Sequence, residues 1–314
     1  MDRLADLTER VRAGHAPSMA RMISLIESGR DGIDECVAQL HAAGGHAHIV
    51  GITGPAGSGK STLVAALTRE LRARDISVGV VAIDPTSAFS GGSILGDRIR
   101  MGEMSSDPRV FFRSMATRGA LGGLSGATSD AVAVLDAART DYVLVETVGA
   151  GQVEVDIATA SHTTVVVSVP GLGDEIQTIK AGLLEIADIH VVNKADLDGA
   201  NKAIGELKSM LKMSGPEESR KPRVLPVTAS SGAGVVELVE ALEDHRRWLE
   251  ESGELEQRER DMATMRVKTI VQGLVLRRMQ DPSTDADFAA VIEKVRGRRL
   301  DPMSAARQLI QRTL

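Results

Sequence analysis

The residues best suited to chemistry lie in one glycine-rich segment, Gly54 to Ser61. They match the phosphate-binding pattern G-x-x-x-x-G-K-[ST] at every fixed position. Gly57 and Gly59 let backbone N–H groups approach phosphate oxygens, because no Cβ stands in the way. Lys60 is expected to bridge the outer phosphates, and the Ser61 hydroxyl is expected to ligate Mg²⁺. A glycine-rich turn without a ligand is the alternative. The predicted nucleotide contacts are Gly54, Pro55, Ala56, Gly57, Ser58, Gly59, Lys60, Ser61 and Thr62.

A second motif, Asn193 to Asp196, fits the guanine-reading pattern N-K-x-D. The Asp196 carboxylate can accept hydrogen bonds from N1–H and the 2-amino group of guanine. Adenine offers no such pair of donors, so a buried unpaired carboxylate would reject it. Four residues alone could be an ordinary strand-to-loop junction, but their place after a full phosphate loop favours guanine. The residues after the last predicted strand, Thr228 to Ser230, are placed to donate backbone N–H groups to the base. The expected base contacts are therefore Asn193, Lys194, Asp196, Thr228, Ala229 and Ser230.

Magnesium requires further oxygen ligands near Ser61 and the phosphates, directly or through water. The acidic candidates are Asp84, Asp97 and Glu146. Glu146-Thr147-Val148-Gly149 stands where related GTPases often carry D-x-x-G, so the Gly149 N–H could bond the γ-phosphate and sense its loss. Each acid could instead cap a helix or be a solvated loop charge. The predicted metal ligands are Ser61, Asp84, Asp97 and Glu146, and the predicted catalytic set is Lys60, Asp84, Asp97, Glu146 and Gly149.

The position after Gly149 points to slow chemistry. Ras-like proteins place a water-orienting glutamine directly after that glycine. Here the residue is Ala150, and Gln152 comes two residues later. We therefore expect slow hydrolysis by the chain alone, accelerated when a partner orders the surrounding loops. The glycine-rich segments Gly91–Asp97 and Arg118–Gly123 are either ordinary loops or switches that order around nucleotide.

The elements that must position these residues alternate between strands and helices. Apolar runs predict strands at His48–Thr53, Ile76–Ile83, Tyr142–Val145, Thr163–Val169, Ile189–Val192 and Val224–Val227. Short apolar strands separated by helices indicate a mostly parallel sheet covered on both faces, an α/β fold. Ligands bind such sheets outside the carboxyl ends of the strands, where the polar motifs fall. The predicted domains are an N-terminal helical extension (1–45), the phosphate-loop domain (46–246) and a C-terminal helical region (247–314).

Composition narrows the classes of partner. The chain of 314 residues has a net charge of −6 and only 2% aromatic residues, which argues against a nucleic acid or an anionic membrane as its partner. The single cysteine, Cys36, excludes an intrachain disulfide and a multi-cysteine metal site. No apolar signal core or membrane-length apolar run is present. A cytoplasmic protein without a membrane partner is expected.

Five segments together resemble the MeaB/ArgK family of P-loop GTPases. The resemblance covers most of the chain and is far more specific than a phosphate loop alone. The matching segments are Gly51–Thr62, Val81–Ser87, Gly91–Arg98, Val145–Gln152 and Pro170–Gln177. The phosphate loop has Pro55 and Ala56 at positions that the mechanism does not fix.

The resemblance implies a GTP-dependent chaperone for an adenosylcobalamin-dependent acyl-CoA mutase. Family members bind the mutase, use GTP to gate cofactor loading and protect the mutase from inactivation. The resemblance also implies direct or water-mediated Mg²⁺ contacts for Ser61, Asp84, Asp97 and Glu146. It marks Gly171–Lys180 as a further switch, in a segment that the sequence alone would read as a helix N-terminus with capping acids. The helices after Arg246 correspond to the family's homodimerisation arm.

Two other functions compete with this interpretation. A small-molecule kinase of the amino-acid transport type would need an acceptor pocket with a base, and no such constellation stands out. A nickel-type metallochaperone GTPase would tend to carry histidine-rich or Cys/His motifs near the nucleotide. The nearest histidine group is His41, His46 and His48, and we expect these residues to flank a strand instead. Nothing in the sequence identifies which mutase would be the client.

Overall fold

The computed structural model describes residues 2–84, 104–116, 126–147, 156–171, 184–213, 221–279 and 282–313. The chain divides into two compact units, Met1–Met262 and Ala263–Leu314. The first unit contains the phosphate loop and the guanine motif, and the second is helical. The domain boundaries expected from sequence, after residues 45 and 246, stay a prediction.

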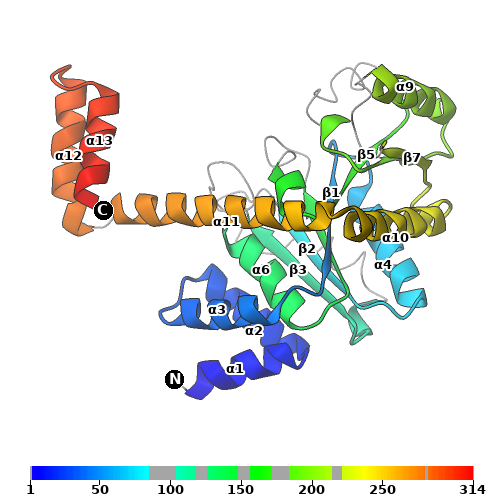
Figure 1. The fold of residues 1–314 in the computed structure, drawn as a ribbon, viewed down its shortest axis with the longest axis horizontal. Helices are drawn as coiled ribbons and strands as arrows, with labels where there is room; N and C mark the ends of the chain where they lie inside the picture. The colour runs from blue at the N-terminus through cyan, green and yellow to red at the C-terminus, as the bar shows by residue number, and fades with distance from the viewer. Residues whose placement is uncertain are drawn as a thin grey trace. The chain divides into compact units, whose positions relative to one another are not determined.

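A seven-stranded sheet with the strand order β3-β2-β4-β1-β5-β6-β7 forms the centre of the first unit (Figure 1). Every strand pair in the described ranges is parallel, which confirms the predicted α/β fold. All residues of β1, β4, β5 and β6 are buried, and this explains why most of their residues are apolar. The strands are β1 (His48–Thr53), β2 (Val78–Asp84), β3 (Val110–Ala116), β4 (Tyr142–Thr147), β5 (Thr163–Ser168), β6 (Ile189–Val192) and β7 (Arg223–Pro226).

Strand β3 is absent from the strands that the sequence predicted. It is an edge strand whose neighbour is β2, with Val110 opposite Val78. Its second half carries Arg113 and Ser114, so the apolar run that marks the central strands is broken. Arg113 instead forms an ion pair with Glu27 at the end of α2. A strand that pairs on one side and carries a charge lacks the pattern of a fully buried strand.

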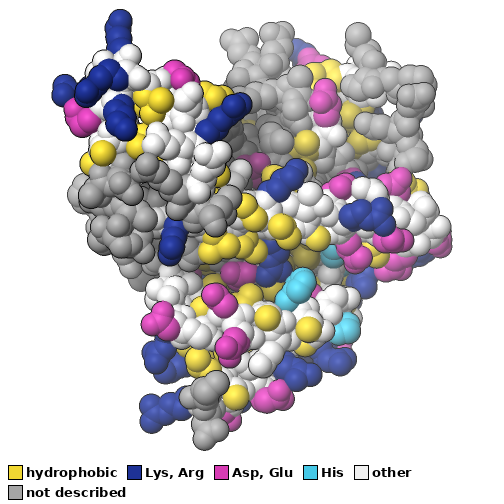
Figure 2. Space-filling view, turned by 60° about the vertical axis from the view of Figure 1, so that its left-hand side comes forward, with side chains coloured by type: hydrophobic (Ala, Val, Ile, Leu, Met, Phe, Trp, Pro, Cys, Tyr) yellow, Lys and Arg dark blue, Asp and Glu magenta, His cyan; other side chains and the backbone are white. Residues whose placement is uncertain are grey.

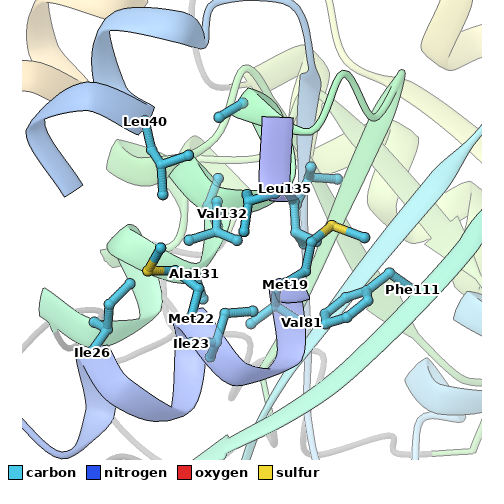
Figure 3. Packing of buried hydrophobic residues seen from close by; sticks show 14 of the residues in the cluster. Met19, Met22, Ile23, Ile26, Leu40, Val81, Phe111, Ala131, Val132 and Leu135 are labelled. Atoms are coloured by element: carbon cyan, nitrogen blue, oxygen red, sulfur yellow. The ribbon is translucent and has the colours of Figure 1, made fainter. Parts of the chain in front are cut away.

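Helices cover both faces of this sheet. The first face packs against α4 (Lys60–Ala73) and α10 (Val235–Ser252), through a cluster that includes Ile52, Leu67, Leu144 and Leu242. The opposite face packs against the N-terminal helices and α6, and Figure 3 shows Met19, Met22 and Leu135 in this cluster. The expected short N-terminal helices are confirmed, and their methionines serve as core. The helices on this face are α1 (Asp2–Arg12), α2 (Ala16–Glu27), α3 (Ile33–Ala43) and α6 (Gly126–Ala137).

A polar network joins the amino ends of β1, β5 and β6. The Thr163 hydroxyl oxygen lies 2.8 Å from both His48 Nε2 and His245 Nδ1. Asp188 directly precedes β6 and accepts hydrogen bonds of 2.6 and 2.9 Å from the Arg258 guanidinium. Because Arg258 lies in α11 (Glu254–Met279), this ion pair attaches the first turns of α11 to the sheet.

Burial and hydrogen bonding set the protonation states of the histidines and the aspartate in and near this network. Exclusion of water is the main cause that lowers the pKa of His48 to about 2 and the pKa of His162 to about 4. Burial likewise lowers the pKa of His190, in β6, to about 4. For Asp188 burial opposes ionisation, but hydrogen bonds from His245 and Arg258 outweigh it and lower the pKa. At neutral pH, therefore, His48, His162 and His190 are uncharged and Asp188 is a carboxylate.

The second unit consists of the C-terminal part of α11, α12 (Pro282–Arg296) and α13 (Pro302–Thr313). The long helix α11 lies in the C-terminal region that the sequence predicts to be helical. Val291, Ala305 and Leu309 form the small buried core between α12 and α13. Figure 2 shows exposed hydrophobic side chains gathered along α11, where Val267, Ile270, Val271 and Leu274 are 42–60% exposed. No helix in the described ranges is long and apolar enough to cross a membrane.

Candidate nucleotide-binding site

The phosphate loop lies between the carboxyl end of β1 and the N-terminus of α4. Gly54, Gly57 and Gly59 all have positive φ, at +141°, +76° and +85°. A Cβ on Gly54 would lie 2.1 Å from the Val167 carbonyl oxygen in β5, so the loop passes too close to the sheet for a side chain there. The helix α4 begins at Lys60, directly after Gly59, and its N-terminus therefore faces the loop. This geometry matches a phosphate cradle that combines backbone N–H groups with a helix dipole.

Lys60 is folded against the loop. Its Nζ donates to the carbonyl oxygens of Gly54 at 2.7 Å and Pro55 at 2.9 Å, and the residue is 5% exposed. The ammonium group therefore lies within the loop, where the outer phosphates of a nucleotide are expected to bind. Ser58 is fully buried, and its hydroxyl has no hydrogen-bond partner within the described ranges.

Ser61 and Glu146 bring together two of the predicted magnesium ligands. The Ser61 hydroxyl donates to Glu146 Oε1 over 2.5 Å, and Glu146 is 7% exposed. Glu146 lies on the face of the sheet that α4 covers, because residues two apart on a strand share a face and Leu144 packs there. Ser61 lies in the first turn of α4 itself. A hydroxyl and a carboxylate oxygen are hard donors that suit Mg²⁺, which usually takes one or two protein oxygens together with phosphates and waters. The described residues contain no group of three or more His, Cys, Asp or Glu that could hold a metal by themselves.

The guanine motif is joined to the phosphate loop. Asn193 is 2% exposed, and its Nδ2 donates to the Ser58 carbonyl oxygen over 2.8 Å. Its Oδ1 accepts from the Ala229 N–H over 3.1 Å. Lys194 has a positive φ of +55°, and its Nζ donates to the Gly57 carbonyl oxygen over 3.0 Å. Asn193 thus connects the phosphate loop to the loop after β7 that the sequence expects to contact the base.

Some of the other predicted site residues lie in the described ranges, and the rest lie outside them. Asp196, Ser230 and Thr62 are exposed, so Asp196 is accessible to a guanine base. Asp84 ends β2, and Ile83 beside it is paired with Thr147, so its backbone reaches the same sheet edge as Glu146. Residues that lie outside the described ranges include Asp97, Gly149, Ala150, Gln152, the segments Gly91–Asp97 and Arg118–Gly123, and residues 172–180 of the predicted switch.

Sequence reasoning did not single out Thr53 and Thr147. These residues end β1 and β4, and their hydroxyls are hydrogen-bonded to each other over 3.0 Å. The available signal was a polar residue at the last position of each apolar strand, directly before Gly54 in one case and directly after Glu146 in the other.

The described residues also line a cavity of about 490 Å³ at the amino edge of the sheet, which holds none of the predicted site residues. His245, Trp248 and Arg258 are among its lining residues. The predicted nucleotide contacts lie instead at the carboxyl edge, where open α/β sheets bind ligands.

The geometry agrees with what the chain resembles among known proteins. The family model described as methylmalonyl-CoA mutase-associated GTPase MeaB matches residues 19–284. A Pyrococcus horikoshii protein that is named only as a GTPase is 46% identical over 99% of both chains. The Escherichia coli GTPase ArgK is 32% identical over 98% of this chain and 95% of its own.

A mammalian protein and a solved structure are also similar to this chain. The mouse mitochondrial methylmalonic aciduria type A homolog is 34% identical over 83% of this chain and 64% of its own. A crystal structure of an LAO/AO transport system kinase superposes with a TM-score of 0.74 at 25% identity, over 99% of this chain and 97% of that one. The chain therefore belongs to the MeaB family of methylmalonyl-CoA mutase-associated P-loop GTPases.

Proposed function

We propose that this GTPase is a nucleotide-dependent chaperone that gates adenosylcobalamin loading of an acyl-CoA mutase and protects that mutase. The observation that carries the nucleotide half is the Asn193 bridge from Ser58 to Ala229, which connects the phosphate loop, the guanine motif and the loop after β7. Support for the mutase half comes from the family's description as mutase-associated and from the likeness to the methylmalonic aciduria type A homolog.

In this proposal each site residue has a separate task. Backbone N–H groups of residues 54–62 and the Lys60 ammonium bind the phosphates and stabilise charge that develops on them. Ser61 and Glu146 would hold Mg²⁺, with Asp84 and Asp97 as further candidates and Gly149 as the sensor of the γ-phosphate. Bound Mg²⁺ would neutralise phosphate charge during transfer to water. Asp196 reads the guanine edge, and the loop Thr228–Ser230 supports the base.

The proposal also includes slow turnover by the chain alone. Ala150 follows Gly149, so the side chain that orients water in Ras-like proteins is replaced by a methyl group. A client that orders the loops around the nucleotide would then raise the rate. Single-turnover hydrolysis of GTP, measured with and without a purified adenosylcobalamin-dependent mutase, tests this point. Fast hydrolysis by the isolated chain would contradict it.

The partner is tested by affinity capture from an extract of the source cells, with a non-hydrolysable GTP analogue or GDP bound to the protein. We expect recovery of an adenosylcobalamin-dependent acyl-CoA mutase whose amount depends on the nucleotide. A matched Lys60→Ala variant, which loses the phosphate-binding ammonium, should abolish the nucleotide dependence. Recovery of a nickel enzyme instead would defeat the proposal. GTP consumption without release of inorganic phosphate would point to the kinase alternative.

We include a homodimer and a cytoplasmic location in this proposal. Val267, Ile270, Val271 and Leu274 lie at spacings of three, four and seven residues, so they share one exposed face of α11. A second copy would bury such a stripe as a helix–helix contact. Light scattering of the wild type and of Val271→Glu should give a dimer and a monomer, respectively. A monomeric wild type would contradict the dimer.

A further inference from the structure

Two buried hydroxyls meet beside the phosphate loop. Thr147 Oγ1 donates to Thr53 Oγ1 over 3.0 Å, and the two residues are 1% and 0% exposed. Both lie on the face of the sheet opposite α4, because residues alternate between faces along a strand. Their neighbours on that face of β1 and β4 include Ile49, Val143 and Val145, which are aliphatic core residues.

Packing alone does not explain this pair. Valine has nearly the shape of threonine, and replacing both partners of a buried hydrogen bond by apolar groups of the same shape can be close to neutral. A single hydroxyl in this environment would instead be costly to bury without its partner. The pair therefore specifies a distance and a direction between two strands that an aliphatic contact would leave looser.

The position of the pair connects it to the site. Strand pairing between β1 and β4 extends to Ile52 opposite Glu146, so the threonines are one residue beyond the last paired residues. Thr53 directly precedes Gly54, whose backbone is pressed against the Val167 carbonyl oxygen of β5 on the other side. Thr147 directly follows Glu146, which accepts from Ser61. The hydroxyl pair thus extends the β1–β4 connection to the point where the phosphate loop begins.

We propose that Thr53 and Thr147 are positioning residues for GTP hydrolysis. Their hydrogen bond holds the end of β4 at a fixed distance from the start of the phosphate loop, and this places the Glu146 carboxylate against Ser61. Without it, the strand ends can separate, and Glu146 loses its alignment with the metal side of the site. This inference rests on GTP hydrolysis by the chain and is independent of the proposed mutase partner.

The test uses Thr53→Val, Thr147→Val and the double variant, with Thr147→Ser as the conservative change. Thermal unfolding, single-turnover hydrolysis and the Mg²⁺ dependence of fluorescent GDP binding are measured for each. Each single valine should lower the melting temperature, because it leaves one hydroxyl without its partner. The double variant should recover most of the lost melting temperature. It should nevertheless hydrolyse GTP about 10- to 100-fold more slowly, since small displacements of groups in an active site slow reactions by factors of that order.

Magnesium dependence separates positioning from packing. The double variant should need more Mg²⁺ for half-maximal stimulation of GDP binding, whereas binding without Mg²⁺ should stay near that of the wild type. Thr147→Ser keeps a hydroxyl and should remain close to the wild type in every measurement. A matched control is Thr68→Val in α4, which removes a buried hydroxyl bonded to the Val64 carbonyl oxygen and should leave hydrolysis unchanged.

Wild-type hydrolysis and Mg²⁺ dependence in the double valine variant would show that the pair serves packing alone. Should the double variant be too unstable to assay, Thr147→Ser decides: a rate near that of the wild type supports the proposal, and a loss as large as that of Thr147→Val overturns it.

Discussion

Asn193 donates a hydrogen bond to the backbone of Ser58 across 135 positions of sequence, over 2.8 Å. The donor follows β6 and the acceptor lies in the phosphate loop after β1, so the sheet brings the base-reading and phosphate-binding motifs together. The same side chain also accepts from the Ala229 N–H. The nucleotide site is therefore held by one amide that contacts both loops.

Replacement of Asn193 by alanine should weaken binding of both GTP and GDP strongly. The change removes both hydrogen bonds and leaves the buried Ala229 N–H without this acceptor. Because nucleotide binding must then restore the positions of both loops at the cost of such a contact, about 1–3 kcal/mol, affinity should fall roughly 5- to 150-fold. Fluorescent-nucleotide titration measures the effect. The matched control is Asn201→Ala, at an exposed position of α9 (Ala200–Met213), which should not change affinity. Equal affinities for the two variants would contradict the bridging role.

Gly59→Ala should damage the site from the other side of the same contact. Gly59 has a φ of +85°, and a Cβ there would lie 2.5 Å from Asn193 Nδ2. An L side chain would therefore strain the backbone and displace the asparagine. We expect nucleotide affinity to fall at least about tenfold, as expected for the loss of one hydrogen bond between uncharged groups, here the bond made by Asn193. Gly205→Ala, within α9 and with nothing near its Cβ, should keep affinity and stability at or above those of the wild type.

Arg258→Met should destabilise the first unit. The change leaves the Asp188 carboxylate, 11% exposed, without the guanidinium that pairs with it, and breaking such a pair costs about 3 kcal/mol before allowance for the 28% exposure of Arg258. Denaturant unfolding should show the loss, and adding Asp188→Asn should recover part of it because the buried charge that has lost its guanidinium partner is removed. Arg10→Met, which breaks the exposed ion pair with Asp6, should change stability by less than about 1 kcal/mol. Equal losses for Arg10→Met and Arg258→Met would contradict the anchoring role.

Stability should fall on acidification between about pH 6.5 and pH 4. The pKa of His162 is lowered from 6.5 to about 4 by burial, chiefly, and by the charges of Arg246 and Arg258, against an opposing effect of Asp136. In this window the unfolded chain binds the proton and the folded chain does not. Each such histidine therefore lowers the free energy of unfolding by up to about 1.4 kcal/mol for each unit by which the pH falls. His48 and His190 contribute in the same direction.

His162→Asn isolates one of these contributions. Asparagine places its Oδ1 near the position of the imidazole Nδ1, which accepts from the Ile49 N–H over 3.1 Å, and it does not titrate. The slope of unfolding free energy against pH should therefore decrease between pH 6.5 and 4. An unchanged slope would show that His162 is not protonated on unfolding in that range. His46→Asn, an exposed change, is the matched control and should keep the slope of the wild type.

Much of the site was determined by local sequence. The spacing from Gly54 to Ser61 fixes the loop's backbone requirements, since positive φ at Gly57 and Gly59 is available to glycine at little cost. The run Asn193–Asp196 likewise predicts base recognition, and short, mostly apolar runs identify strands that are buried on both faces. Local chemistry also showed that Ala150 cannot orient a water molecule through a side-chain amide.

Only the tertiary structure decided how these pieces act on one another. The contacts of Asn193 with Ser58, of Ser61 with Glu146 and of Thr53 with Thr147 depend on strand order and register, which no pattern along the chain specifies. Strand β3 escaped prediction because its apolar run is interrupted by Arg113, which is paired with a helix far away in sequence. The sequence by itself determined which groups can bind a guanine nucleotide, whereas folding decided which of those groups hold each other in place, because the distances between strands are set by packing of the whole sheet.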